Sequence, residues 1–428
     1  MEAKSLESHV MYPYSYAYGK SSKTLLYESL ARCLEKVAAK HNKIAVISEH
    51  ENVMKTFQEL NADANRLAKV MAQKLHIKLG DVVAVMTANC YNFVVIQYAC
   101  AKIGAILCPI NAYYTSQELE MCLKKVNPKL FFIPSKGSDQ ELSVNKIYDV
   151  FVDIKTELPS KLSHVIFLDG NGSSCGPLKN CASHYFSDLV YGEDKICADE
   201  LNNNVFVDID ADEVCSFFFT SGTTGSPKAA ILSHFNLTNN TRFFGERLDF
   251  AAGNNVIVCL PVPVFHVFGA VLGTITMATT GVTIVMTGYR YSVESVVHAI
   301  IKHKCTHFMG VPAMLIDIMN YIEDNNLQIT TLVGVITAAT TVPYEVVQRF
   351  ATLVPTISRI DIVYGATECS PIVTSPLPQT KIEDALDNVG VPLDFVEVKL
   401  VDRDTGKIVK IGEKGSNLKR TNERINFY

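Results

Sequence analysis

The most informative part of the sequence is FFFTSGTTGSPKAAILS, residues Phe217–Ser233 of the 428-residue chain. Its apolar start predicts a buried strand, and the polar residues after it predict a loop that ends at Lys228. Glycines let a backbone approach an anion closely and turn its N–H groups toward it, while hydroxyls and a lysine add donors and positive charge. We therefore predict a phosphate-binding loop formed by Thr220, Ser221, Gly222, Thr223, Thr224, Gly225 and Lys228.

This loop differs from the common nucleotide-binding pattern Gly-x-x-x-x-Gly-Lys, because Pro227 occupies the position of the second glycine. A solvated Ser/Thr/Gly loop between two strands is the simpler alternative. The strand before the loop and the lysine at its end favour phosphate binding, as does a second motif farther along the chain.

The second motif is YGATE, Tyr364–Glu368, which directly follows the predicted strand Ile360–Val363. Open α/β sheets bind ligands at the carboxyl ends of their strands. The Tyr364 ring can stack on a base and Gly365 permits close approach, while Thr367 and Glu368 offer the oxygen atoms that Mg²⁺ prefers. A tyrosine at a strand end is more often a core residue. The motif therefore indicates a nucleotide site only in combination with the predicted phosphate-binding loop.

Short apolar runs alternate with helical patterns along most of the sequence. The strands that these runs predict are Val82–Met86, Ile106–Ile110, Leu130–Ile133, Val165–Leu168, Cys215–Thr220, Val256–Leu260, Val282–Met286, His307–Val311, Leu332–Thr337 and Ile360–Tyr364. Such alternation predicts an α/β fold with parallel sheets covered by helices. We expect two stacked, mostly parallel sheet-and-helix subdomains that meet near about residues 200–215, and a partial β-subdomain from about residue 385.

The last part of the sequence changes character after Gly415. Val396–Val401, Asp402–Gly406 and Lys407–Val409 predict a hairpin. Ser416–Tyr428 has no apolar periodicity, so we expect a tail that belongs to no folded element.

Composition excludes several classes of protein. The formal net charge is −5 and no basic block is present, so nothing favours nucleic-acid binding. Phe250–Tyr289 carries no Asp, Glu, Lys or Arg, but Pro261 and Pro263 interrupt it. It predicts a buried strand, loop, helix and strand rather than a transmembrane span. Peripheral contact of one face with a membrane stays an open possibility. The 12 cysteines include no Cys-x-x-Cys pair, which favours reduced thiols over disulfides or a zinc site.

The two motifs, in this order, resemble those of the adenylate-forming (AMP-binding) enzymes, which include the acyl-CoA synthetases. The resemblance covers nearly the whole chain and is closest to the medium-chain acyl-CoA synthetases. Supporting stretches are SYAYG from Ser15, Gly104–Glu120 and SHFNLTNN from Ser233. The resemblance implies that ATP and a fatty acid form an acyl adenylate and pyrophosphate, and that CoA then forms the thioester.

The resemblance also implies roles for particular residues. The loop Thr220–Gly225 would hold the β- and γ-phosphates with Lys228 at its end. Tyr364, with Gly365 and Ala338, would border adenine, and Thr367 and Glu368 would hold the α-phosphate, with Glu368 binding Mg²⁺. His266, in PVFHVFG, matches the family's histidine beside the carboxylate and acyl tunnel. Without that match, a histidine between apolar residues is more often a satisfied core residue.

Three features depart from the family pattern. Ala229 stands in place of a glycine, which would cost about 1–2 kcal/mol if the backbone there had a positive φ. Thr337-Ala338-Ala339 replaces a glycine-bearing stretch and would narrow or block the adenine and acyl path. The family continues past Gly412–Gly415 into a ribose-binding aspartate and a small carboxyl-terminal domain with a catalytic lysine, which this sequence lacks. We therefore expect little or no acyl-CoA synthesis from this polypeptide.

Other interpretations stay open at this point. One is a nucleotide- or acyl-binding pseudoenzyme, a second is an unstable isoform, and a weaker one is a luciferase-like oxygenase. Residues 1–20 contain no arginine and no apolar core segment, so we find no clear targeting peptide. The resemblance implies a mitochondrial location, and a cytoplasmic one is the alternative. The sequence does not address the oligomeric state.

Overall fold

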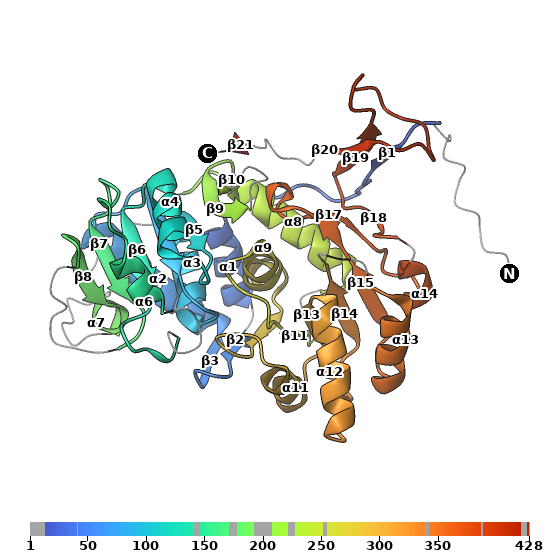
Figure 1. The fold of residues 1–428 in the computed structure, drawn as a ribbon, viewed down its shortest axis with the longest axis horizontal. Coiled ribbons are helices and arrows are strands. Elements are labelled where there is room, and N and C mark those ends of the chain that lie inside the picture. The colour runs from blue at the N-terminus through green and yellow to red at the C-terminus, as the bar shows by residue number, and fades with distance from the viewer. Residues whose placement is uncertain are drawn as a thin grey trace.

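The computed structural model describes residues 13–40, 42–140, 146–170, 178–191, 208–220, 227–250, 255–338, 340, 342–386, 388–420 and 426–427. Two large sheets and two small ones are built from these residues (Figure 1).

An eight-stranded sheet has the strand order β21-β10-β9-β5-β4-β6-β7-β8. Its strands are β4 (Val82–Met86), β5 (Ile106–Ile110), β6 (Leu130–Ile133), β7 (His164–Phe167), β8 (Ala182–Tyr185), β9 (Val214–Thr220), β10 (Lys228–Ser233) and β21 (Asn426–Phe427). The strands from β9 to β8 are parallel, and β10 runs antiparallel to both of its neighbours. Apolar runs form the central parallel strands β4, β5 and β6 because helices bury both of their faces, whereas β8 at the edge is polar and partly exposed.

A seven-stranded sheet has the order β15-β14-β13-β11-β12-β2-β3. Its strands are β2 (Ile44–Ser48), β3 (Val53–Thr56), β11 (Ile257–Cys259), β12 (Thr283–Met286), β13 (His307–Gly310), β14 (Gly334–Thr337) and β15 (Arg359–Ile362). All neighbours are parallel except β2 and β3, which form an antiparallel hairpin at one edge.

Helices fill the space between the two large sheets and cover their outer faces (Figure 1). The central helices, which share one apolar cluster with both sheets, are α1 (Leu30–Lys40), α2 (Phe57–Gln73), α3 (Tyr91–Ile103), α8 (His234–Arg247), α9 (Val267–Gly269), η2 (Ala270–Ile275) and α10 (Thr276–Thr280). The outer helices are α4 (Ser116–Val126) and α6 (Ile147–Val152) on the first sheet, and α11 (Val293–Lys302), α12 (Pro312–Asp324) and α13 (Tyr344–Leu353) on the second. Both α2 and α4 begin at a capping box, Thr56 with Glu59 and Thr115 with Glu118.

The α/β fold with stacked, mostly parallel sheets is therefore confirmed, but the predicted meeting point near residues 200–215 is wrong. β9 and β10, which span residues 214–233, belong to the same sheet as β4–β8, and the chain passes to the second sheet only after α8. The chain also starts in the second sheet, because Val46 of β2 pairs with Ile284 of β12. This long-range parallel pairing leaves no local signal in the sequence.

The described residues also form two small sheets. The first contains β16 (Tyr364–Gly365), β17 (Ile372–Ser375) and β18 (Val391–Pro392). The second contains β1 (Tyr16–Tyr18), β19 (Glu397–Val401) and β20 (Ser416–Arg420), and the predicted turn from Asp402 is present, since the Asp402 N–H donates to the Lys407 carbonyl oxygen.

The expectation that residues after Gly415 form no folded element is wrong for Ser416–Arg420. These residues pair antiparallel with β19, from Val401 opposite Ser416 to Glu397 opposite Arg420. Backbone groups supply this pairing, so a strand at a sheet edge needs no apolar alternation. Asn426 and Phe427 likewise pair with β10.

The uncharged segment Phe250–Tyr289 folds as predicted, into β11, a loop, the continuous helices α9, η2 and α10, and then β12. Its helical part is buried. None of the helices in the described part of the chain has the length and apolar character that a membrane span requires.

Candidate functional site

The predicted phosphate-binding loop connects β9 to β10. Thr220 and Lys228 lie opposite each other in this antiparallel pair, and the Thr220 hydroxyl donates to the Lys228 carbonyl oxygen at 3.5 Å. The Lys228 side chain is exposed and Thr220 is half-buried. The other loop residues of the prediction, Ser221, Gly222, Thr223, Thr224 and Gly225, lie outside the described residues.

The second motif forms a tight turn. Tyr364 and Gly365 make up β16, and Thr367–Cys369 form a short 3-10 helix, η3. The Ala366 N–H donates to the Pro371 carbonyl oxygen at 3.0 Å, and the Cys369 N–H donates to the Ala366 carbonyl oxygen at 2.8 Å. Because η3 lies beside β10, the two motifs meet on the same side of the molecule.

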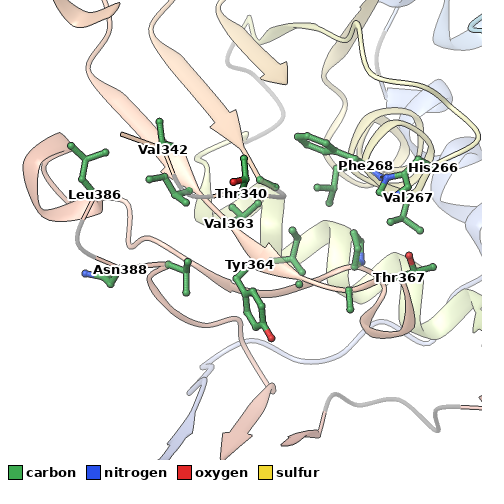
Figure 2. Close-up of a pocket in the computed structure, with 18 residues that line it drawn as sticks. His266, Val267, Phe268, Thr340, Val342, Val363, Tyr364, Thr367, Leu386 and Asn388 are labelled. Carbon is green, nitrogen blue, oxygen red and sulfur yellow. The ribbon is translucent and has the colours of Figure 1, made fainter. Parts of the chain in front are cut away.

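A cavity of about 620 Å³ opens at this turn (Figure 2). Five of the predicted site residues line it: His266, Ala338, Tyr364, Gly365 and Thr367. Figure 2 shows His266 and Thr367 toward one end of the cavity and Leu386 and Asn388 toward the other. Glu368, Thr220 and Lys228 are not among the lining residues, so the cavity brings together only part of the predicted site.

The remaining lining residues are mostly apolar. They are Val267, Phe268, Leu272, Thr340, Val342, Ile362, Val363, Ala366, Pro371, Ile372, Leu386, Asn388 and Val389. Phe268 and Leu272 lie one helical turn apart, on α9 and η2, which places both on the helix face toward the cavity. In the sequence they look like ordinary core residues.

His266 is the N-cap residue of α9. Its Nδ1 accepts a hydrogen bond from the Phe268 N–H at 3.2 Å, while its carbonyl oxygen accepts from the Ala270 N–H at 2.9 Å. The imidazole is exposed at its cavity side, but the residues packed around it desolvate it in part and lower its pKa below the ordinary value, which favours the neutral ring. In the neutral ring, Nδ1 accepts a hydrogen bond and therefore has no proton, so the proton is on Nε2. The Nε2–H group can then donate to a ligand in the cavity.

The structure resolves two of the three departures from the family pattern. Ala229 is fully buried in β10 and does not have a positive φ. The backbone strain that an alanine with a positive φ would cause is therefore absent at this position. Ala338 lines the cavity, and Thr337 is fully buried at the end of β14. The methyl groups of Thr337 and Ala338 therefore leave a cavity in place. Ala339 lies outside the described residues.

The donor set suits a magnesium ion that is bound together with a nucleotide. Glu368 and Thr367 follow each other in η3 and offer a carboxylate and a hydroxyl, and Glu368 is half-buried. Among the residues that the structure describes, no group of three or more His, Cys, Asp or Glu side chains could hold a metal ion by itself. Magnesium commonly takes only one or two carboxylates and completes its shell with substrate phosphates and water.

A family profile described as "AMP-binding enzyme" matches residues 33–420. The chain belongs to the AMP-binding enzyme family. The matched region extends past the predicted boundary at Gly415 and includes β20. A curated relative, the zebrafish (Danio rerio) "Medium-chain acyl-CoA ligase ACSF2, mitochondrial", is 31% identical over 415 residues. The match covers 94% of this chain but 66% of that relative, so the chain spans less than two thirds of its length.

Solved structures of other AMP-binding enzymes share the fold. A long-chain-fatty-acid-CoA ligase (FadD1) from Archaeoglobus fulgidus has a TM-score of 0.79 and 24% identity, with 97% of this chain and 79% of that chain covered. The N-terminal domain of FACL13 from Mycobacterium tuberculosis has a TM-score of 0.75 and 23% identity, with 93% and 90% covered. The described architecture is that of the amino-terminal domain of these enzymes.

Proposed function

We propose that this chain activates a medium-chain fatty acid with ATP, which yields an acyl adenylate and then, with CoA, only a small amount of the thioester. The observation that carries the proposal is the convergence of three separate segments on one cavity. His266 follows β11, Ala338 follows β14 and Tyr364–Thr367 follows β15. Parallel α/β sheets bind ligands at this end of their strands.

The first step joins the carboxylate to the nucleotide. A carboxylate oxygen attacks the α-phosphorus of ATP, a new P–O bond forms, and the bond to the bridging oxygen breaks as pyrophosphate leaves. A carboxylate is a weak nucleophile that faces a polyanion, so the protein must hold the two groups in line and offset their charge. In the second step the CoA sulfur attacks the acyl carbonyl carbon, AMP leaves with the bonding electrons, and the thiol proton passes to solvent.

Each predicted residue has a place in this scheme. The loop Thr220–Gly225 and Lys228 hold the β- and γ-phosphates, and the Tyr364 ring stacks on adenine. Thr367 and Glu368 hold the α-phosphate, where a bound magnesium ion supplies charge neutralisation. The Nε2–H of His266 donates to the fatty acid carboxylate and orients it toward the α-phosphorus. The location of His266 and Thr367 toward one end of the cavity supports this arrangement.

The apolar wall supports a fatty acid as the acid substrate. Phe268, Leu272, Val342 and Ile372 line the cavity, and they offer an alkyl chain an environment in which it loses contact with water. The medium chain length in this proposal comes from the name of the zebrafish relative, as does a mitochondrial location. Fractionation of cells that express the tagged chain tests the location.

The test follows each half-reaction separately. The purified chain is incubated with ATP, Mg²⁺ and octanoate, and pyrophosphate release is measured against a control without octanoate. We expect octanoate-dependent release, with less release for acetate and palmitate. CoA is then added and octanoyl-CoA is detected by mass spectrometry, which also tests the prediction that little thioester forms.

The outcomes separate the open interpretations. Octanoate-dependent pyrophosphate release supports the proposed adenylation. Binding of Mg·ATP in isothermal titration without any pyrophosphate release, for acids from acetate to palmitate, would favour a nucleotide-binding pseudoenzyme. A chain that neither binds Mg·ATP nor releases pyrophosphate contradicts both.

A further inference from the structure

Asn240, in the middle of α8, is bonded to the turn that carries the second motif. Its Nδ2 donates to the Ile372 carbonyl oxygen at 2.8 Å and to the Cys369 carbonyl oxygen at 3.4 Å. Its Oδ1 accepts from the Ile372 N–H at 3.1 Å. The side chain is buried, and both ends of its amide are used. One side chain thus fixes the backbone at the end of η3 and at the start of β17.

The turn between these two points needs such support. Ser370 has a φ of 67°, in the left-handed region that residues other than glycine rarely adopt. The Ser370 side chain is fully buried, and its hydroxyl has no hydrogen-bond partner among the residues that the structure describes. A residue in such a conformation persists only where the surrounding contacts fix it. The contacts from Asn240 fall on either side of Ser370.

The consequence for the cavity is direct. Ile372 lines the cavity, and so does Thr367, which begins the 3-10 helix that ends at Cys369. We propose that Asn240 is a positioning residue for nucleotide binding, because it holds the turn that presents Thr367 and Glu368 to the α-phosphate and the magnesium ion. This inference rests on the proposed function, since it assigns the turn to Mg·ATP.

The neighbouring residue Asn239 is a matched control. It lies on the same helix, is buried, and also makes three hydrogen bonds through its amide. Its partners are the N–H and carbonyl oxygen of Leu26 and the carbonyl oxygen of Phe235, which do not line the cavity. The loss of either amide removes three hydrogen bonds of α8, but only the amide of Asn240 bonds to the turn that carries the second motif.

The experiment compares Asn240→Ala with Asn239→Ala in the full chain. Isothermal titration with Mg·ATP gives the dissociation constant and the fraction of binding-competent protein, and thermal unfolding gives the stability. A loss of folded protein lowers the number of sites in the titration but leaves the dissociation constant of the folded remainder unchanged. Outer-shell groups that orient metal and phosphate ligands are commonly worth about 10–100-fold in affinity. We expect Asn240→Ala to weaken Mg·ATP binding by about tenfold or more, and Asn239→Ala to lower stability with an unchanged dissociation constant.

The results that overturn the inference are distinct from those that overturn the proposed function. If the unaltered chain does not bind Mg·ATP, the proposed function fails. If it binds and Asn240→Ala binds equally well, or if Asn239→Ala weakens binding as much, the positioning role is wrong. Should Asn240→Ala not fold, Asn240→Leu takes its place, because it keeps the approximate size of the side chain, adds no charge and lacks the amide that bonds to Cys369 and Ile372. Unchanged affinity in Asn240→Leu likewise contradicts the inference.

Discussion

A Cβ atom on Gly365 would lie 1.8 Å from the carbonyl oxygen of Pro371. That carbonyl also accepts the hydrogen bond from the Ala366 N–H, so the backbone just before β17 lies too close to Gly365 for any side chain at this position. Gly365 and Pro371 both line the cavity. The glycine of the second motif is therefore required by a backbone contact at the site.

We predict that Gly365→Ala lowers octanoate-dependent pyrophosphate release by about 100-fold, because Pro371 and the adjoining turn must move by a substantial part of an ångström or more. Steady-state kinetics with varied ATP measures the effect, and thermal unfolding shows whether the variant is folded. Gly406→Ala is the control. Gly406 has a φ of 68°, and apart from its chain neighbours no atom of the described residues lies within 4 Å of an added Cβ, so that change adds backbone strain without a clash and away from the cavity. Rates for Gly365→Ala equal to those of the Gly406→Ala control would contradict the prediction.

The two nitrogens of His266 have separate tasks, and two substitutions distinguish them. In His266→Asn the amide oxygen can still accept from the Phe268 N–H, but the donor that corresponds to Nε2 is lost. His266→Ala removes both. We predict that each variant loses about 10²–10³-fold in octanoate-dependent pyrophosphate release, as is typical when one donor to a reacting oxygen is removed. Only His266→Ala should lose the N-cap contribution, about 1 kcal/mol of stability in urea unfolding.

Near-normal activity in His266→Asn would show that the ring acts in the structure only through its N-cap. Equal stability of His266→Asn and His266→Ala would show instead that the bond to Phe268 contributes nothing.

The stability of the fold should depend on pH through His234. This residue is fully buried at the start of α8, where its Nδ1 accepts from the Leu30 N–H at 3.1 Å. Burial lowers the pKa of His234 from 6.5 to about 4. Between these two values the unfolded chain binds a proton that the folded chain does not, so acidification favours unfolding. The contribution of His234 to stability is complete above pH 6.5 and is lost as the pH falls toward 4.

The variant His234→Asn can keep an acceptor for Leu30 and cannot titrate. We predict that stability falls less steeply for this variant than for the unaltered chain between pH 6.5 and pH 4, by up to about 1.4 kcal/mol per pH unit. Urea unfolding at several pH values in this range measures both slopes. Identical slopes would mean that His234 does not release its proton on folding.

The sequence predicted the elements of the core better than it predicted their arrangement. Val82–Met86 and Ile106–Ile110 have the predicted limits, because continuous apolar runs of this length are typical of strands buried on both faces. The edge hairpin of β2 and β3 joins the seven-stranded sheet because β2 pairs with β12, more than 200 positions away in the chain, and periodicity does not encode this pairing. Ser416–Arg420 pairs through its backbone and so lacks the pattern that would have revealed it.

The same distinction holds for the candidate site. Tyr364 and Thr367 were predictable because they belong to a motif that follows an apolar strand, and His266 was predicted only through its match to the family pattern. The structure brings all three to one cavity. Val342, Leu386 and Val389 also line the cavity, but an apolar side chain that faces a ligand has the same sequence signature as one that faces the core. The role of Asn240 depends on the turn at Ser370, which only coordinates reveal.

A buried ion pair in β15 offers a test of what stabilises the seven-stranded sheet. The Arg359 Nε donates to Asp361 Oδ2 at 2.6 Å and its Nη2 donates to Oδ1 at 2.7 Å. Asp361 is fully buried, and burial raises the pKa of its carboxyl in spite of the guanidinium beside it. The free-energy cost of burying this carboxylate is therefore larger than the stabilisation that the Arg359 guanidinium gives it. The pair should add little net stability to the fold, although the loss of either partner alone leaves the other charge buried without compensation.

We predict that Arg359→Met alone lowers the free energy of unfolding by about 3–5 kcal/mol at pH 7, because it leaves the Asp361 carboxylate buried without its partner. The double variant Arg359→Met/Asp361→Leu should regain most of this loss, since two apolar side chains of similar size remove both charges. A double-mutant cycle in urea, completed with Asp361→Leu, measures the coupling. If the double variant is as unstable as Arg359→Met, the stability of this edge depends on the ion pair itself. In that case the geometry of the pair, with its two short hydrogen bonds, outweighs the cost of burying the charges.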